Sequence, residues 1–118
     1  MTAANLRGLD AAFLVGDPLT SRYRKRIHEL AALQSMPMFV PAPEYVECQA
    51  LLGYGPSLRD SVRQAAAYVD KILRGAKPAD VPIKQPKEYR LVVNLRTAKR
   101  LGIKLPSSLV IRADEVIQ

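Results

Sequence analysis

Few side chains in this sequence have the types and spacing that chemistry requires. His28 is the single histidine and Cys48 the single cysteine. One cysteine excludes an internal disulfide, and one residue of each type argues against a Cys/His zinc site. His28 follows the apolar Ile27 in a helical run, so we expect a surface residue in preference to a general base. Cys48 lies in a predicted loop, so we expect a buried, inert thiol in preference to a nucleophile.

Two acidic side chains are spaced for acid–base chemistry. Glu44 and Glu47 are three residues apart and would share one face of a helical turn. No other residues complete a catalytic set, so solvated loop acids are the preferred interpretation. The sequence also contains no GxxxxGKS/T phosphate loop, no GxGxxG turn and no GxSxG nucleophile turn. We therefore expect a protein without catalytic residues, metal or cofactor, and not an enzyme.

Asp17 and Tyr54 each have two interpretations. Asp17 precedes Pro18 and is placed to cap a helix; alternatively, its carboxylate would accept a hydrogen bond from a ligand ammonium or hydroxyl group. Tyr54 would pack at a strand end; alternatively, its ring would close over a ligand, because the neighbouring Gly55 allows close backbone approach. The sequence alone leaves these alternatives open.

The charge of the chain is unevenly distributed. Lys and Arg number 18 against 11 Asp and Glu, a net charge of +7, and the whole excess lies in residues 57–118. The basic residues are scattered and no aromatic stacking set lies among them, so we expect a solvated surface and no nucleic-acid partner. The cluster Arg22–Arg26 is likewise interpreted as a solvated helix face in preference to an anion site. No apolar run is long enough for membrane insertion.

The first half of the chain alternates strands with a helix. Short apolar runs predict strands at 11–16, 36–40 and 50–54. Asp17 and Pro18 predict the start of a helix that runs to about Gln34. Its inward face is predicted from the spacing of four residues, Tyr23, Ile27, Leu30 and Ala31.

The second half is organised around one amphipathic helix, predicted over 57–74 and closed by Gly75. Its apolar stripe comprises Leu58, Val62, Ala65, Ala66, Val69, Ile72 and Leu73. The proline-rich segment 76–88 is a connector, because proline removes ladder donors. A strand at 89–93 follows, then short helices after Asn94 and Pro106 and a tail that adds a short strand or lies over the surface.

This order of elements indicates an α/β fold, a mainly parallel sheet flanked by helices, in one domain or a fragment of one. In parallel sheets, ligands bind outside the carboxyl ends of the strands. If the strands run the same way, the loops 17–20, 41–47 and 54–57 form one rim. We take this rim as the candidate binding edge.

A long stretch resembles a known family. The run AAYVDKIL, GAKPAD, the QP step, VVNLRTAKRLG, a proline–serine turn and ADEVI is similar to the C-terminal part of the ABC-transporter substrate-binding proteins, grouped with tryptophan- and amino-acid-type binding proteins. The upstream DAAFLVGDPLTSRYRKRIHELAALQSMPMFV resembles the preceding strand–helix–strand of the family. The resemblance covers nearly everything beyond residue 9.

The resemblance implies a type I periplasmic binding protein, in which two α/β lobes are hinged around a ligand cleft. Family members are longer and begin with an export signal, so this sequence matches only their last part. Residues 1–55 and 89–118 would belong to the second lobe. Helix 56–75 would pack on the first lobe, and 76–88 would cross back between the lobes.

The resemblance also implies site residues: Asp17, Thr20, Glu44, Tyr45 and Tyr54 match cleft-facing or hinge positions. Two departures accompany them. Gln49-Ala50 stands where the family often has two glycines, and Gly53 replaces the usual serine.

The function implied is non-catalytic binding of a small solute such as an amino acid, as an incomplete part of an ABC importer that works with a permease. The alternative is a stand-alone basic α/β interaction module that has lost transport. The family is periplasmic, but the N-terminus of this chain shows no secretory signal, which would make it cytoplasmic if expressed as given. Alone, helix 57–74 would either fold back or mediate self-association.

Overall fold

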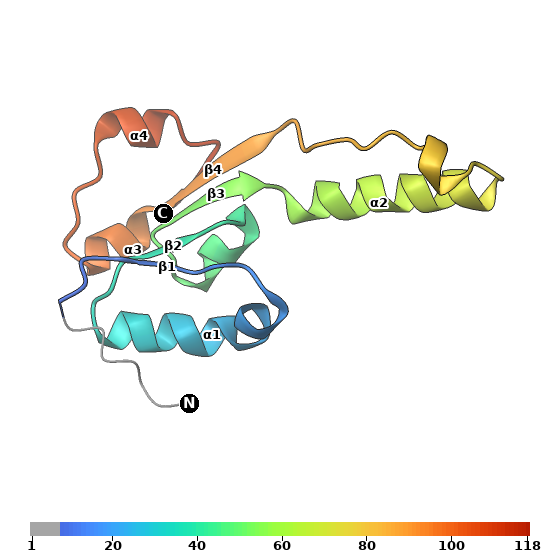
Figure 1. Ribbon diagram of the computed structural model, residues 1–118. Helices are drawn as coiled ribbons and strands as arrows, with labels where there is room; N and C mark the ends of the chain where they lie inside the picture. Colours follow the sequence, from blue (N-terminus) through green and yellow to red (C-terminus); the bar gives the residue numbers. More distant parts are fainter. Residues whose placement is uncertain (1–7) are drawn as a thin grey trace.

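A twisted sheet forms the main body of the protein in the computed structural model, which describes residues 8–118 (Figure 1). Within that range the sheet has five strands in sequential order: β1 (Ala12–Phe13), β2 (Met38–Val40), β3 (Leu52–Pro56), β4 (Tyr89–Asn94) and β5 (Glu115–Ile117). All neighbouring strands pair in parallel except β3 and β4, which are antiparallel. The predicted α/β class with a mainly parallel sheet is therefore confirmed.

β3 and β4 are antiparallel because the chain leaves the sheet and returns to it at the same edge. Pro56, the last residue of β3, pairs with Tyr89, the first residue of β4. Residues 57–88 therefore form an excursion from the sheet, which we call the arm, and the other described residues form the body. Since β1, β2 and β3 are parallel, their carboxyl ends share one edge, as the predicted rim requires. Residues 54–56, predicted as a loop of that rim, belong to β3 itself.

The arm consists of helix α2 (Leu58–Leu73) and the connector that returns along it (Figure 1). Ser57 caps α2, with its Oγ accepting a hydrogen bond from the Asp60 amide at 3.3 Å. Gly75 follows the helix with a φ of 102°, the left-handed region that glycine adopts freely. A short 3-10 turn, η2 (Pro78–Asp80), then begins the return.

Tyr68 of α2 fastens the connector to the helix. Its hydroxyl donates to the Pro82 carbonyl and accepts from the Lys84 amide, each at 3.0 Å. Apart from such contacts the arm projects into solvent, and no residue of α2 is buried. The described protein has a radius of gyration of 17.6 Å, against about 13.5 Å for a compact chain of this length. The structure thus does not show the helix folded back on the body.

Helical segments pack against the sheet of the body. Helix α1 (Pro18–Leu33) and the 3-10 helix η1 (Pro43–Cys48) contribute to the core, and the short helices α3 (Leu95–Arg100) and α4 (Ser107–Ile111) follow β4. The core residues are Leu14, Ala31, Met36, Met38, Val40, Val46, Ala50 and Val92, with His28 also buried. None of the described helices combines the length and apolarity that crossing a bilayer requires.

The inward face of helix α1 includes Ala31, Ile27 and Leu30 as predicted, but it also takes in His28 and leaves out Tyr23. His28 is only 3% exposed, whereas Tyr23, predicted to face inward, is 41% exposed. The prediction that His28 lies on the surface is therefore wrong. The reason is that arginine and lysine occupy much of this helix, so its apolar spacing was a weak guide to the buried face. The interpretation of the Cys48 thiol falls outside the described part of the structure.

The loop after β2, which leads into η1, lies directly against β3. A Cβ at Gly55 would stand 1.8 Å from the Pro41 carbonyl oxygen, and one at Gly53 would stand 2.4 Å from a methyl of Val46. Val46 is fully buried. The two glycines thus allow the loop after β2 to close over β3, which fixes the position of η1 and of the side chains it carries.

Candidate functional site

Asp17 and Thr20 form a reciprocal helix cap at the start of α1. Asp17 Oδ1 accepts hydrogen bonds from the amides of Leu19 at 2.6 Å and Thr20 at 2.9 Å. The Asp17 amide in turn donates to Thr20 Oγ1 at 3.0 Å, and that hydroxyl donates to the Val15 carbonyl at 2.7 Å. The capping interpretation of Asp17 is confirmed, and both residues hold the end of β1 against the start of α1.

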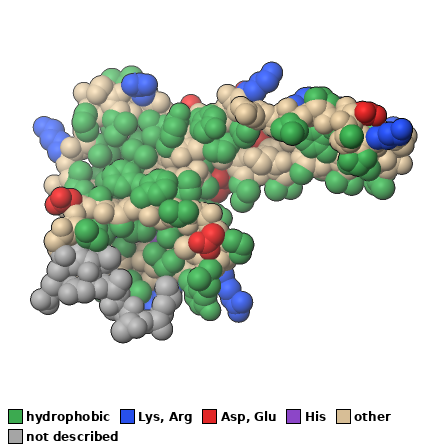
Figure 2. Space-filling model, in the orientation of Figure 1, with side chains coloured by type: hydrophobic (Ala, Val, Ile, Leu, Met, Phe, Trp, Pro, Cys, Tyr) green, Lys and Arg blue, Asp and Glu red, His purple; other side chains and the backbone are tan. Residues whose placement is uncertain are grey.

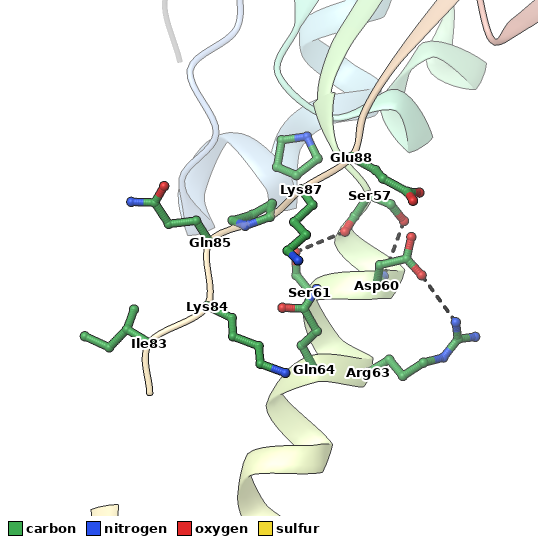
Figure 3. Close-up of a pocket in the computed structure, with 12 residues that line it drawn as sticks. Ser57, Asp60, Ser61, Arg63, Gln64, Ile83, Lys84, Gln85, Lys87 and Glu88 are labelled. Atoms are coloured by element: carbon green, nitrogen blue, oxygen red, sulfur yellow. Dashed lines mark hydrogen bonds and ion pairs between the residues drawn. The ribbon is translucent and has the colours of Figure 1, made fainter. Parts of the chain in front are cut away.

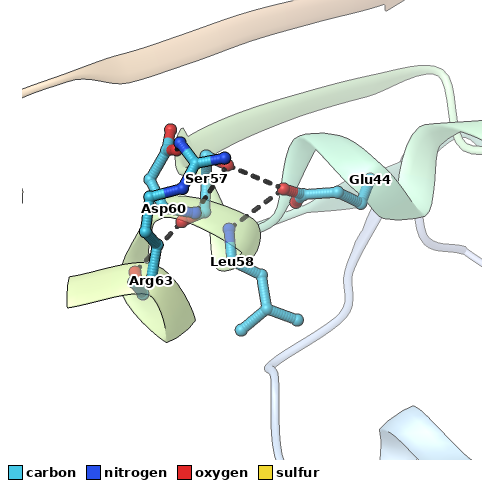
Figure 4. A network of polar contacts seen from close by, with 6 residues as sticks. Glu44, Ser57, Leu58, Asp60 and Arg63 are labelled. Carbon is cyan, nitrogen blue, oxygen red and sulfur yellow. Dashed lines mark hydrogen bonds and ion pairs between the residues drawn. The ribbon is translucent and has the colours of Figure 1, made fainter. Parts of the chain in front are cut away.

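Glu44 reaches from η1 to the first turn of α2 (Figure 4). Its Oε1 accepts hydrogen bonds from Ser57 Oγ at 3.2 Å and from the Leu58 amide at 3.0 Å. A carboxylate at this position satisfies a free helix N–H and interacts favourably with the helix dipole. Glu44 therefore joins the body to the arm.

Tyr45 points from η1 towards α1. Its hydroxyl lies 3.3 Å from Ser21 Oγ, and the guanidinium of Arg24 lies over its ring, 5.6 Å from the centroid. The ring also packs on the core. The Arg22–Arg26 cluster is thus not uniformly solvated, because Arg24 is half-buried, while Arg26 forms an exposed ion pair with Glu29.

Tyr54 lies on the sheet face opposite η1, because Gly53 and Gly55 on either side of it face η1. Its ring stacks on that of Tyr89 with centroids 5.7 Å apart and an angle of 30° between the planes. The two rings are 57% and 51% exposed. This aromatic pair spans the two strands at which the arm departs and returns.

The structure brings the five candidate residues to one edge of the sheet but not into one cluster. Asp17 and Thr20 cap α1, Glu44 contacts α2, and Tyr54 occupies the other face of the sheet. Tyr89 was not predicted to be the partner of Tyr54. Tyr54 and Tyr89 lie together because β4 returns antiparallel beside β3. No local sequence pattern predicts that strand pairing.

A groove of about 980 Å³ runs along the arm beside the point where it leaves the body (Figure 3). Its volume is at the upper end of the range typical of small-molecule sites. Polar side chains from α2 and from the connector face each other across it: Ser57, Asp60, Ser61 and Gln64 on one side, Lys84, Gln85, Lys87 and Glu88 on the other.

A second groove, of about 560 Å³, lies where η1, β4, β5 and α2 meet. Its lining mixes carboxylates with guanidinium groups. Two of the pairs are ion pairs, Arg90 with Glu115 and Arg63 with Asp60, each at 3.3 Å. Because these paired charges are exposed, they contribute little to stability. The acidic and basic side chains that line the groove nearly cancel in net charge.

The position of Gln49 explains one departure from the family pattern. Its φ is 75°, in the left-handed region that glycine adopts without strain. Arg100 Nη1 donates to Gln49 Oε1 at 2.6 Å, and Thr97 Oγ1 donates to the Gln49 carbonyl at 3.3 Å. These contacts from α3 hold a side-chain-bearing residue where the family often has glycine.

His28 is a buried titratable group away from the rim. Neither ring nitrogen has a hydrogen-bond partner among the described residues. Burial lowers the pKa of the imidazole below its ordinary value of 6.5, because desolvation disfavours the charged ring. A small hollow beside it is lined by Lys25, Glu29 and Glu47. His28 is therefore neutral in the folded protein near neutral pH.

We expect the protein to lose stability as the pH falls below 6.5, the unfolded-state pKa of His28. The unfolded chain then binds a proton that the folded chain resists, so folding becomes less favourable, whereas above 6.5 the histidine has no effect. Urea unfolding at pH 7.5 and pH 5.5 measures the difference. The His28→Leu variant should show a smaller loss, and an equal loss in both proteins would contradict this assignment.

The geometry indicates a class of protein. The chain runs from an α/β lobe out to a separate helix and back again, so two adjacent segments connect the lobe to that helix. Hinged binding proteins have this arrangement. Among the described residues no group of three or more His, Cys, Asp or Glu is placed to hold a metal ion. A family model described as ABC transporter substrate binding protein matches residues 6–117. The chain belongs to this family of substrate-binding proteins.

Solved structures support the same fold. A conserved domain protein from Vibrio cholerae is 28% identical with a TM-score of 0.85 over 91% of this chain. An ABC domain from Streptococcus pneumoniae in complex with L-Trp is 25% identical with a TM-score of 0.85 over 93% of this chain. A ligand-free, open substrate-binding protein with adhesive properties from Clostridium difficile shares the fold at 22% identity and a TM-score of 0.63 over 98% of this chain.

The chain spans a little over a third of these proteins: 36%, 37% and 39% of their respective lengths. Among curated proteins, none matches the chain in sequence.

Proposed function

We propose that the chain is the C-terminal part of the solute receptor of an ABC importer, binding a small solute such as an amino acid at the periplasmic side. The observation that carries this proposal is the pair of adjacent crossings, Pro56 beside Tyr89, from which the arm leaves the body. Two crossings between separate bodies create a hinge, and hinged closure around a ligand is how such receptors bind.

In this proposal the segments divide as the resemblance implies. Residues up to 55 and from 89 onwards supply the second lobe, and the arm carries the helix that packs on the first lobe. The uncovered state of the arm supports this division, since Leu58, Val62 and Val69 are 50%, 62% and 55% exposed. A facing lobe would cover this stripe and form the other wall of the cleft. The permease of the importer would dock on the assembled receptor.

The candidate solute contacts are those at the rim and the crossings. Tyr54, with Tyr89 stacked on it, offers an exposed aromatic platform beside the hinge. Tyr45, Asp17 and Thr20 lie at the ends of the neighbouring strands, where their hydrogen bonds already hold them in place. Glu44 borders the second groove.

A chimaera tests the proposal. The matched C-terminal portion of the tryptophan-bound Streptococcus pneumoniae protein is replaced by residues 8–118 of this chain, and the twenty amino acids are screened by thermal shift and calorimetry. We expect the chimaera to bind at least one of them and the 118-residue chain alone to bind none, because half of the cleft is then absent. A chimaera that melts cooperatively yet responds to no amino acid would refute the proposal.

The alternative function is a stand-alone basic interaction module. The net charge of +7 favours it, and retention of the chain on a polyanion column that falls steeply with salt would support it. Among the described residues, the rings that lie beside arginines are single ones, Tyr23 with Arg22 and Tyr45 with Arg24, and the stacked pair Tyr54 and Tyr89 is a separate contact. A partner whose bases stack in series would need several such rings on one basic surface.

A further inference from the structure

The link between the body and the arm points to a conformational role for one side chain. The backbone connects α2 to the body at both ends of the arm. Among the described residues, the side-chain hydrogen bonds that also join the arm to the body are those of Glu44. Its two donors, Ser57 Oγ and the Leu58 amide, lie at the very start of α2 (Figure 4).

Both ends of this link are held firmly. On the body side, η1 is fixed by the fully buried Val46 and by the close approach of the loop to Gly55. On the arm side, Ser57 is only 9% exposed, and while its Oγ donates to Glu44 it accepts from the Asp60 amide. A change in the direction of α2 that carries its first turn away from η1 would therefore break the Glu44 hydrogen bonds, since η1 itself is held in place.

We propose that Glu44 is a latch that holds the arm in its orientation relative to the body. The consequence for the receptor rests on the proposed function, because the arm would carry the first lobe and its orientation would set the opening of the cleft. The latch itself is a property of the described chain and is measurable without any solute.

Glu44 is suited to this role because a carboxylate makes a reversible contact with a helix N-terminus. The hydrogen bonds are charge-assisted and lie at the N-terminal end of α2, where the helix dipole adds to them. Glu44 is nevertheless exposed, so water replaces the helix as its partner when the link opens. The contact is therefore strong enough to bias the arm and weak enough to open.

Spin labels placed by Glu29→Cys on α1 and Lys71→Cys on α2, in a Cys48→Ser background, report the orientation of the arm. Distances between them are measured by pulsed electron paramagnetic resonance in the full chain at low concentration. We expect one narrow distribution in the parent and a broad one in Glu44→Ala. Glu44→Gln keeps the accepting oxygen, so its distance distribution should stay close to that of the parent. Glu44→Asp keeps the charge, but its side chain is too short to reach α2, so its distribution should be broad.

The matched control is Glu47→Ala, an exposed glutamate of the same short helix that makes no side-chain hydrogen bond to α2 among the described residues. Hydrogen exchange gives a second readout: the Leu58 amide should exchange about tenfold faster in Glu44→Ala and unchanged in Glu47→Ala, as expected for loss of one charge-assisted hydrogen bond. Unchanged distances and exchange in Glu44→Ala, or equal broadening in Glu47→Ala, would overturn the latch. The proposed function fails separately, in the chimaera.

Discussion

Gly55→Ala is expected to destabilise the protein by about 3 kcal/mol, the upper part of the range for overpacked sites. The added Cβ would lie 1.8 Å from the Pro41 carbonyl oxygen and 2.9 Å from its carbon. Both atoms belong to backbone, which cannot move aside as a flexible side chain does, so β3 and the loop after β2 must separate. Thermal unfolding followed by circular dichroism should show a midpoint about 12 °C lower.

Gly16→Ala is the matched control. Its Cβ would meet only the Pro41 ring at 3.5 Å, an ordinary van der Waals contact, and its φ lies outside the left-handed region. The same exchange there should change stability by less than about 0.5 kcal/mol. A midpoint for Gly55→Ala within two or three degrees of that of Gly16→Ala, on the order of 0.5 kcal/mol, would show that the loop after β2 does not approach β3 so closely.

Val69→Asp is expected to abolish self-association of the 118-residue chain. With no facing lobe, the stripe of α2 stays open to water, and exposed apolar patches of this kind seek a partner. The space-filling view shows hydrophobic side chains gathered along one side of the arm (Figure 2). Apart from Ile72, the stripe residues are arranged symmetrically about the middle of the helix, which suits the self-complementary contact of an antiparallel pair: Leu58, Val62, Ala65, Ala66, Val69 and Leu73.

Sedimentation equilibrium over a range of concentrations measures this association. We expect the average mass of the parent chain to rise from 13.1 kDa towards twice that value, with an affinity in the micromolar range because one helix pair is smaller than a standard interface. Ala67→Asp puts the same charge on the opposite side of α2 and should leave the association intact. A parent chain that stays monomeric throughout would remove self-association from the account.

Elements with their own start and stop signals were predictable from the sequence. Asp17 before Pro18 predicted the start of α1, and Ser57 and Gly75 predicted both ends of α2. Asn94 was predicted to cap a short helix, and its Oδ1 does accept from the Thr97 amide at 2.9 Å. These signals act within one turn of the chain, so no knowledge of the fold is needed to interpret them.

Features that depend on long-range pairing were not predictable. β1 has only two residues instead of the six expected, and β3 begins at Leu52 instead of residue 50, because strand ends are set by what the neighbours pair with. His28 was assigned to the wrong side of α1, since the burial of a helix face is decided by the sheet beneath it.

The candidate site shows the same division. The location of the rim could be predicted from the order of the strands, but the contacts that each side chain makes could not. Glu44 was interpreted as a loop acid or a ligand contact, and its hydrogen bonds to α2 depend on the way η1 is folded onto β3. The stacking of Tyr89 on Tyr54 depends on the antiparallel return of β4, which joins residues 35 positions apart.

The ladder that unites Pro56 and Tyr89 also makes residues 57–88 separable from the remainder. The two cut points already sit side by side, so a two-residue turn would convert the flanking strands into an ordinary hairpin without disturbing their register. The loop-closure cost of an insertion between such points grows slowly, by about 0.6 kcal/mol for each doubling of its length. Evolution can therefore lengthen, shorten or exchange the excursion as a cassette while the five-stranded scaffold is inherited unchanged.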